Sequence, residues 1–187
     1  MTYKEVRRLD AGSWYSDEYK GEKVPGLREV LELAQGKIKL NIELKPADNG
    51  EELARKTVAL IEKYNMENDC VVTSFSSSAL LAAKSCNENI RVGYILSAAY
   101  GDYYDMKNID FFSVNAAFLS KRTIDAIHNS GKQVYAWTVN NKDSIKNLTN
   151  KGVDGVITDN PVLARETIYS RDTSETIINM IRYVFNQ

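Results

Sequence analysis

The sequence predicts an α/β domain built of repeated strand–helix units with parallel strands. Short runs rich in Val, Ile and aromatic residues alternate with segments whose apolar residues recur at helical spacing. The connections between these elements are short, and this order of elements favours parallel strands covered by helices. With 187 residues, 43% of them hydrophobic, the chain is long enough for one domain with a sizeable core.

Six runs have the composition of strands and are bounded by Gly, Asn or Asp, as strands commonly are. In chain order they are Ile38–Lys45, Cys70–Phe75, Arg91–Leu96, Phe111–Asn115, Val134–Asn140 and Gly155–Thr158. No Gly-rich phosphate loop of the GxGxxG or Walker type follows any of them, which counts against nucleotide-binding versions of an open sheet. Spacing alone leaves two architectures, a closed β/α barrel and an open doubly wound sheet.

Helical segments separate several of these strands and carry their own start and stop signals. Apolar residues at helical spacing mark three of them, namely Leu53, Val58, Leu60 and Ile61; Leu80, Leu81 and Ala83; and Ile124 with Ile127. We expect Ser120 to be the N-cap of one helix and Gly131 to follow its end. Asn141 and Gly152 bracket the next helix in the same way.

The two ends of the chain differ from the middle. Residues 1–25 are polar and rich in turns, with an aromatic cluster at Trp14, Tyr15 and Tyr19. A capping signal at Asp172 opens a last helix whose apolar residues cover more than one face. We therefore expect this helix to pack against the domain or against a partner chain.

Charge and cysteine content narrow the class of protein. The formal net charge is -1 and Lys and Arg are scattered, so nothing favours nucleic acid or an anionic membrane as partner. Cys70 and Cys86 are the only cysteines and form no CxxC, which indicates two thiols in a reducing compartment rather than a disulfide. The sequence shows neither a signal peptide nor a membrane-spanning apolar run, and a cytoplasmic location is the expectation unless a targeting segment preceded Met1.

The segment Lys37–Pro46 carries the clearest pattern for chemistry. Because strand side chains alternate, one face takes Ile38, Leu40, Ile42 and Leu44 and the other takes Lys39, Asn41, Glu43 and Lys45. In a barrel the polar face would point inward, with Glu43 and Lys45 at the carboxyl end of the strand, where barrel active sites lie. In an edge strand the same residues would simply face water. Periodicity alone does not separate these two interpretations.

Other polar residues give weaker signals. Trp137, Thr138 and Asn140 end one predicted strand, and Thr158, Asp159 and Asn160 end the last one. Such residues are common at turns and helix caps for backbone reasons alone. The single histidine, His128, falls in the last turn of a helix before Gly131, where a structural role near the negative helix end is expected rather than a catalytic one.

Four segments in order along the chain resemble glycerophosphodiester phosphodiesterases. They are Leu9–Leu31, Asn41–Lys45 (NIELK), Val134–Asn140 (VYAWTVN) and Gly152–Pro161 (GVDGVITDNP). The family fold is a TIM-type β/α barrel. The resemblance therefore implies an α/β fold in which residues 1–168 form an incomplete barrel of about six of eight strands, and residues 169–187 form a C-terminal helical extension.

The resemblance also implies a reaction and a site. Family members cleave glycerophosphodiesters to an alcohol and glycerol 3-phosphate with a divalent cation, typically calcium or magnesium. Glu43 matches the metal ligand of the ExK motif, and Lys45 matches the lysine that faces the substrate phosphate. Trp137 matches an aromatic residue beside the substrate, and by analogy Phe75 and Trp14 are expected near the barrel mouth.

The chain departs from the family pattern at its N-terminus. The HRG, PEN, ExD and HD motifs, which bring two histidines and an acidic metal-binding pair, do not occur, and the start of the chain resembles the segment after the second barrel strand. No residue is thus expected as the catalytic acid or base, metal binding should be weak, and the isolated chain should be inactive. A barrel without two strands has an open seam, which predicts a homodimer, a covering terminal helix or aggregation.

Two other functions stay open at this point. One is a barrel remnant that serves as a binding or interaction module without catalysis. The other is a different phosphate-handling barrel enzyme, which the ordered motifs disfavour.

Overall fold

The computed structural model describes residues 1–98, 101 and 103–170, and in them six parallel strands form one curved sheet. The strands are β1 (Leu40–Leu44), β2 (Cys70–Ser74), β3 (Arg91–Leu96), β4 (Phe111–Asn115), β5 (Gln133–Trp137) and β6 (Gly155–Val156). They lie side by side in chain order, and every neighbouring pair is parallel. The predicted class, an incomplete β/α barrel with six strands, is confirmed.

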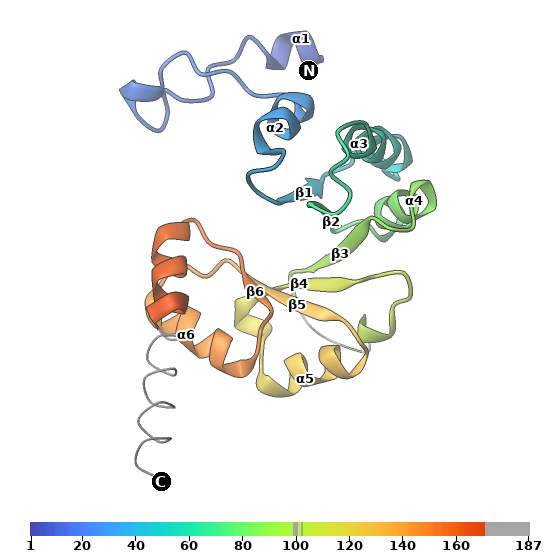
Figure 1. Cartoon of the computed structure of the whole chain (residues 1–187), viewed down its shortest axis with the longest axis vertical. Coiled ribbons are helices and arrows are strands. Elements are labelled where there is room, and N and C mark those ends of the chain that lie inside the picture. The colour runs from blue at the N-terminus through green and yellow to red at the C-terminus, as the bar shows by residue number, and fades with distance from the viewer. Residues whose placement is uncertain (99–100, 102, 171–187) are drawn as a thin grey trace.

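Helices connect most of these strands and cover the outer side of the sheet (Figure 1). The α-helices are α1 (Tyr3–Val6), α2 (Leu27–Ala34), α3 (Glu51–Lys63), α4 (Ser77–Cys86), α5 (Lys121–Asn129) and α6 (Lys142–Lys151), and a further helical segment spans 161–170. Three short 3-10 helices are η1 (Asp17–Tyr19), η2 (Tyr103–Asp105) and η3 (Ala116–Phe118). Crossovers that join parallel strands of one sheet are almost always right-handed, and a series of them between neighbouring strands places the helices on one side of the sheet.

The predicted helix signals are confirmed for α5 and α6. The Ser120 hydroxyl accepts a hydrogen bond from the Thr123 amide, and the Asn141 side chain accepts one from the Ser144 amide. Gly152 ends α6 with a φ of 95°, a left-handed conformation that side chains disfavour. These signals are local in sequence, which is why they could be identified without knowledge of the fold.

The main core lies between the sheet and its covering helices. The outward side chains of the central strands are fully buried there, among them Val72, Val92, Phe112 and Val134. From β1, Leu44 is buried and Leu40 and Ile42 pack against the same core, as the alternation predicts.

Ile38 is the exception to the predicted apolar face of this segment. Its side chain is 66% exposed instead of lying under the helices. The strand begins only at Leu40, so Ile38 precedes the regular alternation and the core that goes with it.

The inner, concave side of the sheet carries a second, smaller packing layer. Gly93 stands beside Phe111 in the ladder, and a Cβ on Gly93 would come within 2.1 Å of that ring. The Phe111 ring stacks on Tyr135 at 4.7 Å between centroids, and the Arg91 guanidinium lies 5.7 Å from its centre. The absence of a side chain at position 93 therefore makes the room that lets an aromatic stack fill this part of the interior.

The sheet has two ends, because β1 pairs only with β2 and β6 pairs only with β5 in the described residues. Both interpretations of the Lys37–Pro46 segment therefore hold in part. It forms an edge strand, and its polar side chains also face the concave side. We refer to the opening between β1 and β6 as the seam.

Three further predictions concern the last helix, membrane-spanning segments and the cysteines. Residues 171–187, which hold the predicted last helix and most of the extension expected at 169–187, lie outside the described residues. Over the part of the chain that the structure describes, no helix combines the length and apolar character needed to cross a bilayer. Cys70 is a buried thiol and Cys86 an exposed one, and neither forms a disulfide.

Candidate active site

A cavity of about 850 Å³ opens at the carboxyl ends of the strands. Both sheet edges contribute to its wall, with Lys39, Asn41, Glu43 and Lys45 from the β1 side and Val156, Ile157, Thr158 and Pro161 from the β6 side. In β/α barrels this end of the strands is where active sites form. Glu43 and Lys45 thus lie at the place where chemistry is expected, and Asn41 and Lys39 line the interior below them.

Glu43 and Lys45 lie side by side at the end of β1. The Lys45 ammonium is 3.6 Å from the Glu43 carboxylate, and the two side chains are 77% and 34% exposed. An ion pair this open to water adds little to stability. Lys45 can therefore leave Glu43 at small cost when another anion enters the cavity.

Below this pair, Asn41 is held by a neighbour on β2. The Thr73 hydroxyl donates a hydrogen bond to the Asn41 side-chain oxygen at 2.9 Å. Thr73 is buried, so the contact fixes the amide orientation at the base of the cavity. No local sequence pattern predicts this pair, because the two residues are far apart along the chain.

An aromatic wall closes the far side of the cavity. The Trp137 ring, at the end of β5, meets the Phe75 ring edge to face with centroids 6.3 Å apart. The Trp137 indole N–H donates to the Ser113 carbonyl oxygen at 3.0 Å, which fixes the plane of its ring. Trp137 and Phe75, predicted from different parts of the sequence, are brought together by the fold.

The turns after β5 and β6 are joined by side-chain hydrogen bonds. The Asn140 oxygen accepts from the Thr158 hydroxyl at 3.1 Å and from the Asp159 amide at 2.9 Å. Asn160 accepts from the Leu163 amide and caps the helical segment that follows. The expected turn and cap role holds for Asn160, whereas Asn140 links two different loops.

His128 lies at the opposite end of the strands, outside this cavity. Its Nε2 is 2.9 Å from the Asp154 carboxylate, which also accepts the Val134 amide at 2.8 Å, where β5 begins. This geometry agrees with the structural role that is expected for His128. The chain has one histidine, so it brings no imidazole to the mouth cavity.

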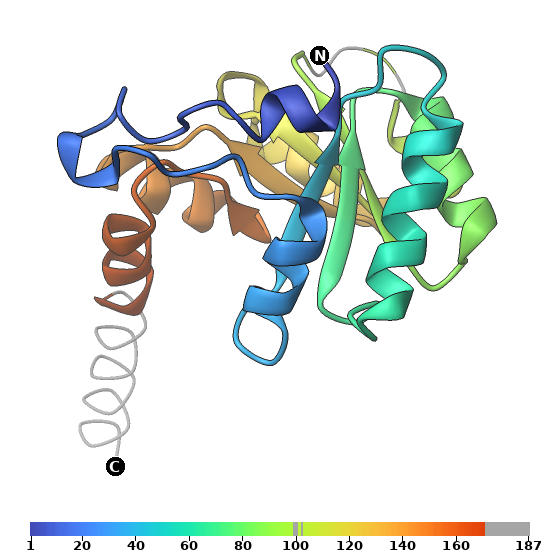
Figure 2. The ribbon, with the colours of Figure 1, turned by 90° about the horizontal axis from the view of Figure 1, so that it is seen from above.

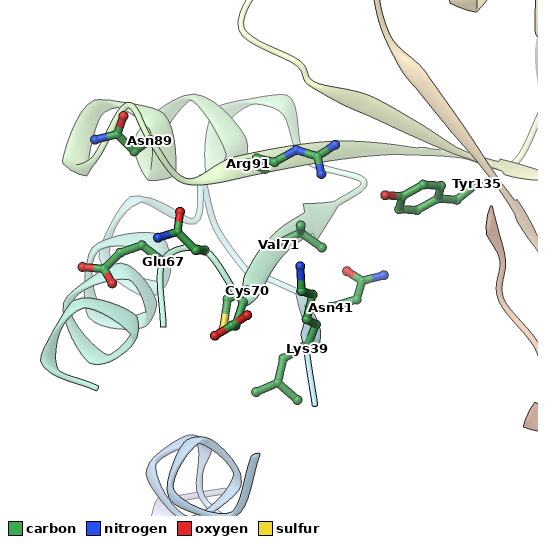
Figure 3. Close-up of a pocket in the computed structure, with 11 residues that line it drawn as sticks. Lys39, Asn41, Glu67, Cys70, Val71, Asn89, Arg91 and Tyr135 are labelled. Carbon is green, nitrogen blue, oxygen red and sulfur yellow. The ribbon is translucent and has the colours of Figure 1, made fainter. Parts of the chain in front are cut away.

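A second cavity of about 410 Å³ opens at the amino ends of β1, β2 and β3 (Figure 3). Arg91 and Tyr135 reach toward each other across it, and Lys39 and Asn41 approach it from β1. Asn41 and Lys39 line both cavities, so the two openings are parts of one concave interior. We call this lower part of the interior the floor.

Comparison with known proteins agrees with this geometry. The sequence model of the glycerophosphoryl diester phosphodiesterase family matches residues 1–163. The chain belongs to this family. A glycerophosphodiester phosphodiesterase of Caldanaerobacter subterraneus is 27% identical over 97% of this chain and 72% of the relative.

Two solved structures share the fold of this family member. A phosphodiesterase of Oleispira antarctica, in complex with the product sn-glycerol-3-phosphate, superposes with a TM-score of 0.78 and 29% identity, over 90% of this chain and 70% of the other. A glycerophosphodiester phosphodiesterase of Parabacteroides distasonis superposes with a TM-score of 0.77 at 21% identity, over 91% and 72%. Each similarity covers most of this phosphodiesterase-family chain and about seven-tenths of the other protein.

The family generally depends on a metal ion, but the donors within the described residues do not make a complete cation site. Among the residues that the structure describes, no three His, Cys, Asp or Glu side chains come together as metal ligands would. Of the described residues on the wall of the mouth cavity, Glu43 alone carries a carboxylate. Calcium takes about six to eight oxygen ligands and magnesium about six, so Glu43 alone cannot hold either tightly.

Trp14, the remaining predicted site residue, lies in the N-terminal loop and not on the cavity wall. Its side chain is 82% exposed, and its indole N–H donates to the Ala11 carbonyl at 2.8 Å. Figure 2 shows the N-terminal segment in dark blue at the end of the molecule where the strands finish. A place for Trp14 beside a substrate at the mouth stays a prediction.

The loop that carries Trp14 is organised by Asp10. Its carboxylate accepts hydrogen bonds from the amides of Gly12, Ser13 and Gly21 and from the Ser13 hydroxyl. These donors, those of Ser13 above all, hold the pKa of the Asp10 carboxyl far below its usual range. The loop therefore has a defined shape although it projects its aromatic residues into solvent.

Proposed function

We propose that the mouth cavity, within a closed barrel, hydrolyses glycerophosphodiesters to an alcohol and glycerol 3-phosphate with the help of a divalent cation. The observation that carries the proposal is the juxtaposition of Glu43 and Lys45 at the carboxyl end of β1, 3.6 Å apart and open to the cavity. Membership of the family supports the reaction class.

Lys45 is proposed to bind the substrate phosphate. Its ammonium is a compact point charge on a flexible chain, and it is largely exposed beside the cavity. A phosphodiester carries one negative charge, which can replace Glu43 as its partner. The expected result is tighter binding of anionic substrate and product than of a neutral glycerol compound.

Glu43 is proposed to contribute one oxygen ligand to the cation. A hard carboxylate donor suits calcium or magnesium, and a bound cation would neutralise phosphate charge. The rest of the coordination shell has to come from groups outside the described residues, so cation binding by this chain alone is expected to be weak.

Trp137 and Phe75 are proposed to form the wall against which the glycerol portion packs. Their edge-to-face contact and the Trp137 hydrogen bond to Ser113 give a rigid apolar surface. The carbon side of a glycerol unit is apolar, so contact with this wall would remove both surfaces from water.

We also propose that the isolated chain does not hydrolyse glycerophosphodiesters. General acid–base catalysis by positioned side chains contributes about 10² to 10⁴ in rate. His128 is the only histidine and lies at the other end of the strands. An isolated chain that binds but does not react would act as a binding module, which is the second function that remains possible.

The test is release of glycerol 3-phosphate from glycerophosphocholine, followed by a coupled enzyme assay with calcium, magnesium or chelator. The purified chain should give no metal-dependent release of glycerol 3-phosphate. Metal-dependent release that Glu43→Ala abolishes and the control Glu88→Ala leaves unchanged would overturn the proposed inactivity. Binding of glycerol 3-phosphate is measured separately by calorimetry. Lys45→Ala should weaken it and Lys63→Ala, on the exposed end of α3, should leave it unchanged.

A further inference from the structure

Residues 10–22 form an ordered loop that projects from the N-terminal part of the chain, at the upper left of Figure 1. The Ala11 amide donates to the Glu22 carbonyl at 2.8 Å, which joins the two arms of the loop. The Gly21 amide adds a second link, because it donates to the Asp10 carboxylate at 2.8 Å. These contacts hold the loop in one shape, and we call it the aromatic loop.

Three aromatic side chains form a row on the outer surface of this loop. Trp14, Tyr15 and Tyr19 are 82%, 72% and 42% exposed. The Trp14 and Tyr15 rings meet edge to face with centroids 5.8 Å apart, and the Tyr15 and Tyr19 centroids are 5.7 Å apart. Scattered single apolar side chains are normal on a protein surface, whereas a contiguous group of them marks an interaction surface.

The charges around this row balance one another. Apart from Asp10, whose carboxylate accepts hydrogen bonds from within the loop, residues 8–23 carry three exposed basic and three exposed acidic side chains. The basic residues are Arg8, Lys20 and Lys23, and the acidic ones are Asp17, Glu18 and Glu22. Nucleic acid or an anionic lipid surface would attract an excess of positive charge, which this part of the chain lacks.

The kind of side chain in the row favours a lipid–water interface. Trp and Tyr combine an apolar ring with a polar group, and both are enriched at the level of phospholipid head groups. The Trp14 indole N–H already donates to the Ala11 carbonyl at 2.8 Å. The ring can therefore enter an apolar layer without leaving its N–H unpaired, which would otherwise oppose burial.

The size of the row disfavours a protein partner. A stable protein–protein interface buries about 800 Å² on each side. An aromatic side chain buries about 150–250 Å² when it is fully covered, so three of them on a projecting loop offer less than such an interface needs. No residue of the aromatic loop lines the mouth cavity or the floor, so neither cavity extends the row.

We propose that the aromatic loop docks on a zwitterionic phospholipid surface, with the rings of Trp14 and Tyr15 between the lipid head groups. The loop belongs to the N-terminal segment at the end of the molecule where the strands finish (Figure 2), so docking turns the mouth cavity toward the head-group layer. The fixed shape of the loop lowers the conformational entropy that binding costs. Docking depends on the loop alone and is independent of the proposed hydrolysis.

The test is flotation of the chain with phosphatidylcholine vesicles in a density gradient, together with tryptophan fluorescence. In a Trp137→Phe background Trp14 is the only tryptophan. Its emission should move to shorter wavelength when vesicles are added, and bromine-labelled acyl chains should quench it. Replacing part of the lipid by phosphatidylglycerol, or raising the salt concentration, should change binding by less than about twofold, because the loop charges balance.

Three variants test the role of the row. Trp14→Ala should weaken vesicle binding about tenfold or more, because the largest ring is lost. Trp14→Tyr keeps an aromatic ring with a polar group and should bind within about threefold of the unchanged chain. Tyr169→Ala removes an exposed ring from the helical segment 161–170, outside the loop, and should have less than about a twofold effect. Circular dichroism checks that each variant folds.

Several results would overturn the proposal. One is that the chain does not float with phosphatidylcholine vesicles, and another is flotation that Trp14→Ala leaves unchanged. Flotation that requires phosphatidylglycerol and disappears at high salt would show that basic side chains, rather than the aromatic row, bind the lipid. Self-association of the chain without lipid that Trp14→Ala abolishes would show that a second copy covers the row.

Discussion

Asn140 and Asp159 join the ends of β5 and β6 through two reciprocal hydrogen bonds. The Asn140 amide nitrogen donates to the Asp159 carboxylate at 2.7 Å, and the Asp159 backbone amide donates to the Asn140 oxygen at 2.9 Å. The two loops that these residues link hold Trp137 and Thr158 on the cavity wall. The pair therefore helps to fix the shape of the mouth cavity from its outer rim.

Replacing Asn140 by Ala should loosen this connection. The lost hydrogen bonds are exposed to solvent, so the expected cost is only about 1 kcal/mol in the free energy of unfolding. For a domain of this size that corresponds to a melting temperature lower by about 2–4 °C. Asn150→Ala, an exposed substitution on α6, is the matched control and should change stability by less than about 0.5 kcal/mol. Equal effects of the two variants would contradict the role given to Asn140.

Gly93→Ala should be much more damaging than an ordinary surface change. The new Cβ would come within 2.1 Å of the Phe111 ring, in an interior layer that also holds Tyr135. Overpacking of this kind typically costs about 1–3 kcal/mol. Urea unfolding measures the loss.

Gly155, which pairs with Tyr135 in the ladder, is the control position for this substitution. At Gly155 an added Cβ would lie 3.2 Å from the Tyr135 ring, a contact that a small side-chain shift relieves. Gly155→Ala should therefore cost clearly less than Gly93→Ala. Adding Phe111→Leu to Gly93→Ala should restore part of the stability, and a double variant less stable than Gly93→Ala would show that the ring is not the source of strain.

Cys70 should make stability fall at alkaline pH. Burial, with smaller effects of the Asp69 and Glu67 charges, raises the pKa of the Cys70 thiol to about 11. An unfolded thiol ionises at about pH 8.5, so the unfolded state loses its proton first as the pH rises. The stabilisation is complete below about pH 8.5 and is lost as the pH rises toward 11, by about 3 kcal/mol at most.

Urea unfolding at pH 8 and pH 10.5 measures this loss, with Cys70→Ala as the control. The variant should be less stable at pH 8 but should show a smaller decrease between the two pH values. Cys86 is exposed and should react with a thiol reagent in the folded protein, whereas Cys70 should react only after unfolding. An equal decrease in the free energy of unfolding at alkaline pH in both proteins would show that other titrating groups cause the decrease.

The parts of the fold that depend on short-range pattern could be predicted from the sequence. The alternation in Leu40–Leu44 predicts which side chains face the helices, and Ser120 and Asn141 predict helix starts, because each signal involves residues a few positions apart. The contact of Asn140 with Asp159 joins residues from two different loops, and no local pattern encodes it. The same holds for the stack of Phe111 on Tyr135.

We expect a structural role for His128, and comparing the stability of variants at His128 and at its partner Asp154 tests it. Asp154 accepts hydrogen bonds from both His128 and the Val134 amide, so Asp154→Ala leaves a backbone donor at the start of β5 without its partner. That variant should cost about 1–2 kcal/mol, and His128→Ala, which loses one partly exposed contact, should cost less than about 1 kcal/mol. His128→Gln should leave the binding of glycerol 3-phosphate, measured by calorimetry, within about twofold, because the side chain lies at the end of the strands opposite the mouth. A loss of binding of about tenfold or more without a loss of stability would instead give His128 a role in the site.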